Sequence, residues 1–174
     1  MKRGCALRRV LSVGWLGFAL CFVAVAQQRS VTGEYRNDAM GFAVRIPDKM
    51  RGQAGDQAGP ERGVGISLPS GGQVTVYGEP NSFGYKTTEE GIRHSLSEYC
   101  DSDKPSISVA RVGKLQGAKG RLMCGERVIE EMLAFRPGGG PIYWLTLQTG
   151  SVHAVEDEAA LGRIAQGFKL IAWR

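Results

Sequence analysis

Two histidines are the side chains of this sequence best suited to acid–base chemistry, because the ordinary imidazole pKa lies near neutrality. They are His94 and His153, and neither stands in a catalytic motif. The sequence contains no nucleophile elbow, paired-histidine zinc motif, P-loop or dinucleotide fingerprint. A serine–histidine–carboxylate set can be assembled from its many serines, but no spacing selects one. We therefore expect no catalytic residues, no metal site and no cofactor.

Two adjacent glutamates, Glu130 and Glu131, form the most unusual charge pair of the sequence. Neighbouring residues of a strand point to opposite faces, so one of the two should point inward. An inward carboxylate can act as a general acid or base, or can pair with an arginine. We favour the structural alternatives, which are an edge strand or a bulge near Arg127 or Arg121.

The cysteines divide into two pairs. Cys5 and Cys21 lie in the expected leader, which leaves Cys100 and Cys124 in the mature chain. In an oxidising compartment two cysteines allow a single intramolecular pairing, worth about 3 kcal/mol through constraint of the unfolded chain. A metal or redox pair is the alternative, but the spacing is not CxxC and only His94 is close enough to add a ligand. We predict a Cys100–Cys124 disulfide.

The first 26 residues have the pattern of a secretory signal peptide. A basic start precedes the mostly apolar run of residues 11–26, which is shorter than the roughly 20 residues that span a bilayer. Ala24-Val25-Ala26 supplies the small residues that a signal peptidase requires. We expect cleavage near Ala26, which leaves residues 27–174 as one periplasmic or secreted domain. A retained membrane anchor is the alternative.

The basic character of the chain comes mainly from this leader. Four of the 22 lysines and arginines lie in it and none of the 17 acidic residues does, so the formal charge falls from +5 to about +1 after cleavage. No basic stripe remains to bind phosphates, which argues against a nucleic-acid partner. We expect contact with a membrane only through the export signal.

Alternating and helical patterns place the elements. The strands expected lie at residues 41–47, 64–68, 74–77, 106–115, 119–124, 127–135 and 142–149. Thr87 and Glu90 fit a capping box that opens one helix, and a second helix is expected over residues 155–167. We interpret residues 27–38 as a polar lead and residues 48–62 as a surface loop. The short turns predict one α+β domain, with a mainly antiparallel sheet of about six to seven strands and two covering helices.

The strand over residues 142–149 carries the candidate binding residues. Tyr143, Leu145 and Leu147 share one face, which we assign to the core. Trp144 and Thr146 share the other face. If the helices cover only one side of the sheet, Trp144 is exposed beside Thr146, as binding aromatics often are. A helix over that face is the alternative.

Two short motifs resemble the Mog1/PsbP-like group of small α/β/α domains. The opening strand Gly41–Pro47 resembles the glycine–aromatic strand of that group, which ends in proline. The closing Leu161, Ile164 and Phe168-Lys169 resemble its last helix and exit. The sequence departs from the group after the proline, where Met50 stands in place of an aromatic. The resemblance implies a non-enzymatic accessory, adaptor or binding domain, and carries over no binding residue for a photosystem or Ran.

These observations favour an exported small binding module without catalytic activity, possessing a protein partner, such as an accessory or immunity-type protein. One alternative is a periplasmic hydrolase that gathers His94 or His153 with a carboxylate and a nucleophile. A second alternative is an envelope-associated structural component, suggested by the apolar tail Leu170–Trp173.

Overall fold

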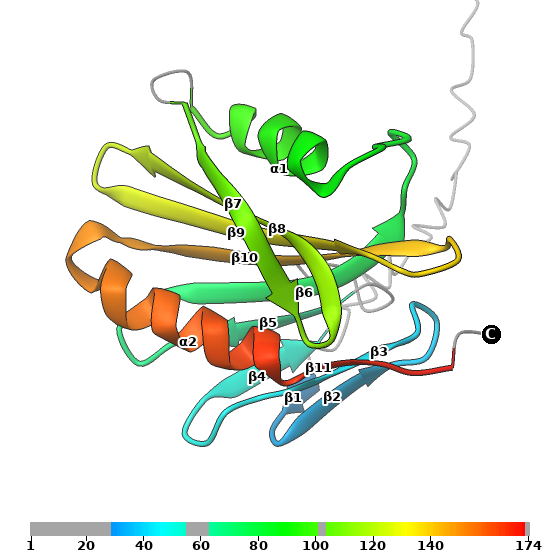
Figure 1. Cartoon of the computed structure of the whole chain (residues 1–174). Coiled ribbons are helices and arrows are strands. Elements are labelled where there is room, and N and C mark those ends of the chain that lie inside the picture. The colour runs from blue at the N-terminus through cyan, green and yellow to red at the C-terminus, as the bar shows by residue number, and fades with distance from the viewer. Residues whose placement is uncertain (1–28, 55–62, 101–103, 173–174) are drawn as a thin grey trace, which may run out of the picture.

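A computed structural model describes residues 29–54, 63–100 and 104–172 (Figure 1). The chain forms an α+β domain with one large antiparallel sheet, one small sheet and two helices. The expected leader and its cleavage site lie outside the described residues. Within those residues, neither helix is both long enough and apolar enough to cross a membrane.

The large sheet has eight strands in the order β1-β4-β5-β6-β10-β9-β8-β7, and all neighbours pair antiparallel. Strands β9 and β10 therefore lie in its interior, and β7 forms one edge. The bounds are β1 (Arg29–Val31), β4 (Arg51–Ala54), β5 (Gly63–Ser67), β6 (Gln73–Pro80), β7 (Ser106–Val112), β8 (Leu115–Cys124), β9 (Arg127–Phe135) and β10 (Pro141–Gly150).

Three further strands form the small sheet, in the order β11-β3-β2. Their bounds are β11 (Phe168–Leu170), β3 (Phe42–Arg45) and β2 (Glu34–Asn37). The rings of Phe42 and Phe168 stack at 5.4 Å, and Phe42 meets Tyr143 of the large sheet at 5.8 Å. Phe42 of the Gly41–Pro47 motif and Phe168 of the last strand therefore pack in the same core.

The fold class is the predicted one, and the strand inventory is larger than expected. Strand β9 has the predicted bounds, whereas the polar lead contains β1 and β2 and the predicted loop over residues 48–62 contains β4. These additions are short strands, and β2 alternates in burial: Tyr35 and Asn37 are buried, while Glu34 and Arg36 are exposed. Strand β2 pairs with β3 and β4 pairs with β1 and β5, and these pairings do not show in the local sequence pattern.

Helix α1 (Thr88–Ser97) covers one face of the large sheet over β8 and β9 (Figure 1). The Thr87 side chain accepts a hydrogen bond from the Glu90 amide at 3.1 Å, as a capping box predicts. The reciprocal bond is displaced by one residue, because Glu90 accepts from the Lys86 amide at 2.8 Å. Ile92 and Leu96 are fully buried against the sheet.

Helix α2 (Ala154–Gln166) follows the short 3-10 turn Ser151–His153 and covers the opposite face, together with the small sheet. Leu161 and Ile164 pack there with Leu145 and Leu147, which confirms the assigned core face of β10. Both faces of the large sheet therefore carry a helix.

A glycine allows α1 to approach the sheet closely, and replacing it is expected to destabilise the protein. A methyl group at Gly120 would lie 2.2 Å from Ile92 Cγ2 and 2.7 Å from Leu96 Cδ1. We expect Gly120→Ala to lower the free energy of unfolding by about 1–3 kcal/mol through overpacking, measured by urea denaturation.

Gly162→Ala in α2 is the matched control, because nothing lies within 4 Å of its added methyl group. This control should stabilise the protein by up to about 1 kcal/mol, and equal stability of the two variants would refute the close approach.

Candidate functional site

The adjacent glutamates Glu130 and Glu131 are both buried, because interior strand β9 is covered on both faces. They point to opposite sides of the sheet, as the strand geometry predicts. We expected one of the two side chains to be buried, and both are. The interpretations as an edge strand or a bulge are wrong. Each carboxylate needs its own explanation.

Glu131 lies beneath the C-terminal end of α1. Its Oε1 atom accepts hydrogen bonds from Ser95 Oγ at 3.1 Å, Tyr99 Oη at 3.2 Å and Thr146 Oγ1 at 3.4 Å. Its Oε2 atom has no partner among the described residues. Burial raises the pKa of Glu131 to about 7, although the three hydroxyl donors oppose the shift. This carboxyl group joins α1 to β10 and carries a proton over much of the acidic range.

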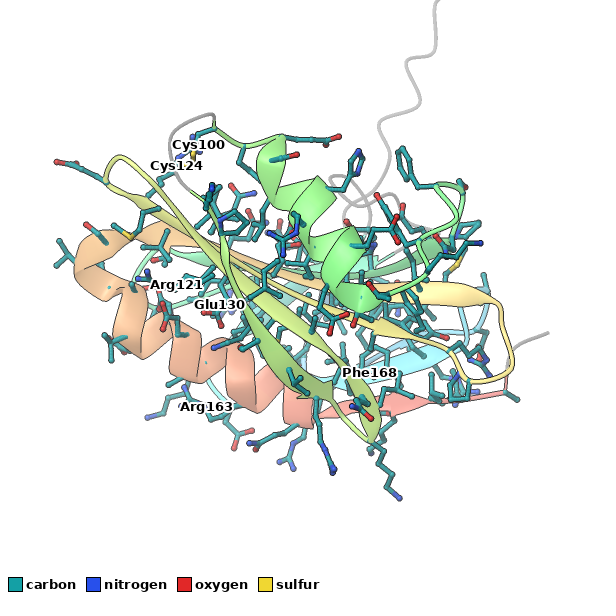
Figure 2. All side chains as sticks on the ribbon, turned by 45° about the horizontal axis from the view of Figure 1, so that its top comes forward. Cys100, Arg121, Cys124, Glu130, Arg163 and Phe168 are labelled. Carbon is teal, nitrogen blue, oxygen red and sulfur yellow. A yellow bond between two sulfur atoms is a disulfide. The ribbon has the colours of Figure 1, made fainter. Side chains whose placement is uncertain are left out.

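Glu130 lies on the α2 side of the sheet (Figure 2). Its Oε1 atom is 3.3 Å from Lys119 Nζ, and burial raises its pKa against the opposing charge of Lys119. The alternative of an arginine partner is not what the structure shows for Glu130, since the nearby Arg121 Nε donates to Glu158 of α2 at 2.7 Å. The Lys119–Glu130 pair joins β8 to β9, and the Arg121–Glu158 pair joins β8 to α2. We therefore assign Glu130 a structural role.

Cys100 and Cys124 form the predicted disulfide, with Cα atoms 6.1 Å apart. The bond joins the chain just after α1 to the last residue of β8 (Figure 2). It therefore restrains the same end of α1 that Glu131 contacts from below.

Trp144 and Thr146 lie on the α1 face, but they are not exposed. Trp144 retains 3% of its accessible surface and Thr146 retains 6%. The Trp144 indole donates to Glu79 Oε1 at 2.8 Å, and its ring stacks with Tyr77 at a centroid distance of 6.4 Å. The prediction of an exposed Trp144 surface is wrong, because α1 and its neighbouring side chains cover this face.

An exposed aromatic cluster lies nearby, at the start of α1. Phe83 precedes the helix and is 71% exposed. Its ring stacks on Tyr85 at a centroid distance of 5.5 Å and an interplanar angle of 22°. His94 of α1 completes the cluster, 5.0 Å from Phe83. The Tyr85 hydroxyl lies 2.7 Å from His94 Nδ1, which fixes both rings.

These three rings line one surface hollow with polar residues of α1 and its cap. We call this surface the α1 patch, and its polar residues are Thr87, Glu89, Glu90, Arg93 and Ser97. Asn81 holds the loop below it, because its side chain bonds both the Tyr85 amide and the Tyr85 carbonyl oxygen at 2.9 Å. The patch is therefore a rigid platform for the exposed Phe83 ring.

The two histidines lie far apart in the chain and both are exposed: His94 is in α1, and His153 ends the 3-10 turn before α2. His94 has Tyr85 and, at 4.0 Å, Glu98 as neighbours. Burial and nearby carboxylates raise the pKa of Tyr85, which keeps its hydroxyl protonated. The described residues include no group of three histidine, cysteine or acidic side chains placed to hold a metal.

Comparisons at the level of sequence find no matching family model and no matching curated protein. Solved structures do match. The solution structure of cyanobacterial PsbP (CyanoP) from Synechocystis sp. PCC 6803 is 14% identical, with a TM-score of 0.54 over 90% of this chain and 99% of that one. LpqN of Mycobacterium tuberculosis, described as involved in cell envelope biogenesis, is 12% identical, with a TM-score of 0.52 over 85% and 92%.

A third match is a crystal structure from Bacteroides thetaiotaomicron VPI-5482, at 11% identity and a TM-score of 0.50. The alignment covers 81% of this chain and 49% of that one, so the chain spans about half the length of that protein. At such identities the likeness concerns the fold alone. It agrees with the resemblance of the opening and closing motifs, and the chain therefore has a PsbP-like fold.

Proposed function

We propose that this protein is an exported, non-catalytic binding module that engages a protein partner through the α1 patch. The observation that carries the proposal is Phe83, a large apolar ring that is 71% exposed while it stacks on the anchored Tyr85. Aromatic residues on rigid supports are the side chains that dominate binding energy at protein interfaces.

The chemistry of the patch favours binding over catalysis. Nucleophilic catalysis requires a nucleophile activated by a base, and the hydroxyl that is hydrogen-bonded to the His94 imidazole belongs to Tyr85, whose pKa is raised rather than lowered. A protonated phenol is a poor nucleophile. It serves well as a hydrogen-bonded support for the ring above it.

The exported location is supported by two observations. The Cys100–Cys124 disulfide is typical of proteins in oxidising compartments, and the N-terminal residues have the pattern of a signal peptide. Among proteins of this fold, LpqN is described as involved in cell envelope biogenesis. We extend an envelope or extracellular setting to this chain as part of the proposal.

Replacing Phe83 with alanine should leave the fold intact and weaken partner binding by about tenfold, the scale of a central aromatic contact. Recovery of the partner by the tagged, exported protein from its native compartment provides the measurement. Val155→Ala is the matched control, because Val155 is 84% exposed on α2, across the sheet from the patch. Equal loss of recovery in both variants, or full recovery with Phe83→Ala, would refute the proposed surface.

A further inference from the structure

The α1 patch has an acidic environment. Glu89 and Glu90 line the hollow itself. Burial is the main cause of the raised pKa of Tyr85, and the carboxylates of Glu79, Glu98 and Glu90 add to it. The Tyr85 hydroxyl, which supports the exposed ring, therefore lies in a negative potential.

The nearby basic side chains do not balance these acids. Arg93 lines the hollow, and Lys86 lies in the sequence between two residues that line it, Tyr85 and Thr87. At the start of α1 the Glu90 amide already donates to Thr87, and the Glu90 carboxylate accepts from the Lys86 amide, which places a negative charge there. The patch therefore presents an excess of carboxylates rather than a site for an anion.

The Phe83 ring adds a second, independent preference for positive charge. Tyr85 covers one of its faces at an interplanar angle of 22°, and the ring remains 71% exposed. The face of an aromatic ring attracts a cation, and the attraction is strongest when the cation is also partly desolvated. The Phe83 ring and the carboxylates therefore both favour a positively charged group.

We propose that the α1 patch binds an arginine side chain on a basic segment of the partner protein. The planar guanidinium group can stack on the free face of Phe83 and donate hydrogen bonds to the carboxylates of the same hollow, Glu89 foremost. A lysine ammonium can pair with the carboxylates but has no planar group to stack on the ring. An acidic segment is repelled by the carboxylates. This inference rests on the proposed function, because it names the chemistry of the partner at the proposed surface.

The test is a titration of the full-length exported protein, followed by nuclear magnetic resonance, with a short glycine–arginine peptide whose ends are blocked. We expect shifts at Phe83, Tyr85 and His94, and ring-current shifts of the arginine side-chain protons. Phe83→Ala should weaken binding by roughly two- to fivefold, the scale of one cation–π contact. Added salt should weaken it further.

Charge variants give matched controls. Glu89→Gln should reduce the affinity for the arginine peptide by about twofold, because one exposed charge contributes little more than that. Glu156→Gln removes an exposed charge from α2 and should have no effect. A matched glycine–lysine peptide should bind more weakly, and a glycine–glutamate peptide should not bind. Tetramethylammonium or the lysine peptide binding as tightly as the arginine peptide would overturn the assignment of arginine.

The experiment separates this inference from the proposed function. If Phe83→Ala abolishes partner recovery but the arginine peptide shifts no signal of the patch, the surface is correct and the arginine assignment is overturned. If the peptide binds at the patch but Phe83→Ala leaves partner recovery unchanged, the patch recognises an arginine side chain, while the proposed function, and with it the assignment of that arginine to the partner, is overturned.

Discussion

Replacing Glu131 with glutamine is expected to remove a large part of the pH dependence of the free energy of unfolding. In the native protein, burial raises the Glu131 pKa from an ordinary value of 4.5 to about 7. A shift of this size corresponds to about 3 kcal/mol, since each pH unit is worth roughly 1.4 kcal/mol. Glutamine has no proton to lose in this range.

The sign follows from the protons that each state binds. Between about pH 4.5 and pH 7 the folded protein retains the proton on Glu131, while the unfolded chain has released it. The contribution of this proton to stability is therefore fully present below pH 4.5 and is lost as the pH rises to about 7. At higher pH the fold holds a buried charge whose Oε2 atom lacks a partner among the described residues.

Urea denaturation of the native protein and Glu131→Gln, from about pH 4 to pH 8, measures this effect. The stability of the native protein relative to the variant should fall by about 3 kcal/mol as the pH rises. Glu156→Gln, an exposed site on α2, should follow the native curve. Parallel curves for the native protein and Glu131→Gln would show that Glu131 does not titrate as its burial requires.

Removing the disulfide by the double substitution Cys100→Ser and Cys124→Ser is expected to lower the free energy of unfolding by about 3 kcal/mol. The bond closes a loop between residues 24 positions apart, and opening it frees the unfolded chain. It also releases the end of α1, where Tyr99 donates to Glu131. Amide exchange should therefore increase most at that end of the helix.

Chemical denaturation under non-reducing conditions provides the measurement. The native protein treated with a reductant is the control, and it should become as unstable as the double variant. A double variant as stable as the oxidised native protein would mean that the bond does not constrain the unfolded chain. Normal exchange at the end of α1 would mean that Glu131 and the core alone hold the helix.

Local sequence patterns predicted the elements that carry strong side-chain signals. Thr87 opens α1 because its hydroxyl caps a free amide, and this signal lies within four consecutive residues. Strand β9 was predicted with correct bounds because its apolar residues and its flanking turns agree. The pairing of Cys100 with Cys124 followed from the cysteine count, given export.

The short strands near the β1 edge of the large sheet could not be predicted in the same way. Strand β4 contains Gly52, where an added methyl group would lie 2.6 Å from Ile46 Cδ1. The position therefore favours glycine, which gives no strand signal in a sequence. Strand β4 is defined by its pairing with β1 and β5, and such long-range pairing is not written in local periodicity.

The prediction of the Trp144 binding surface was wrong for the same reason, because it too depended on long-range packing. The alternation of β10 correctly placed Trp144 opposite Tyr143, but it contains no information on which strands α1 covers. The α1 patch joins a loop aromatic, Phe83, to His94 in the helix, and neither residue stands in a motif. The available signal was an aromatic pair, Phe83 and Tyr85, directly before a helix cap.

The claim that the α1 patch is the partner-binding surface is tested most directly by crosslinking from its centre. A photoreactive phenylalanine derivative would replace Phe83 in one variant and Val155 in the other, both of them exposed apolar positions. Our account predicts one discrete, light-dependent adduct with a protein partner from position 83, formed in the native compartment, and none from position 155. An adduct from position 155 alone, or no adduct from either position, would contradict it.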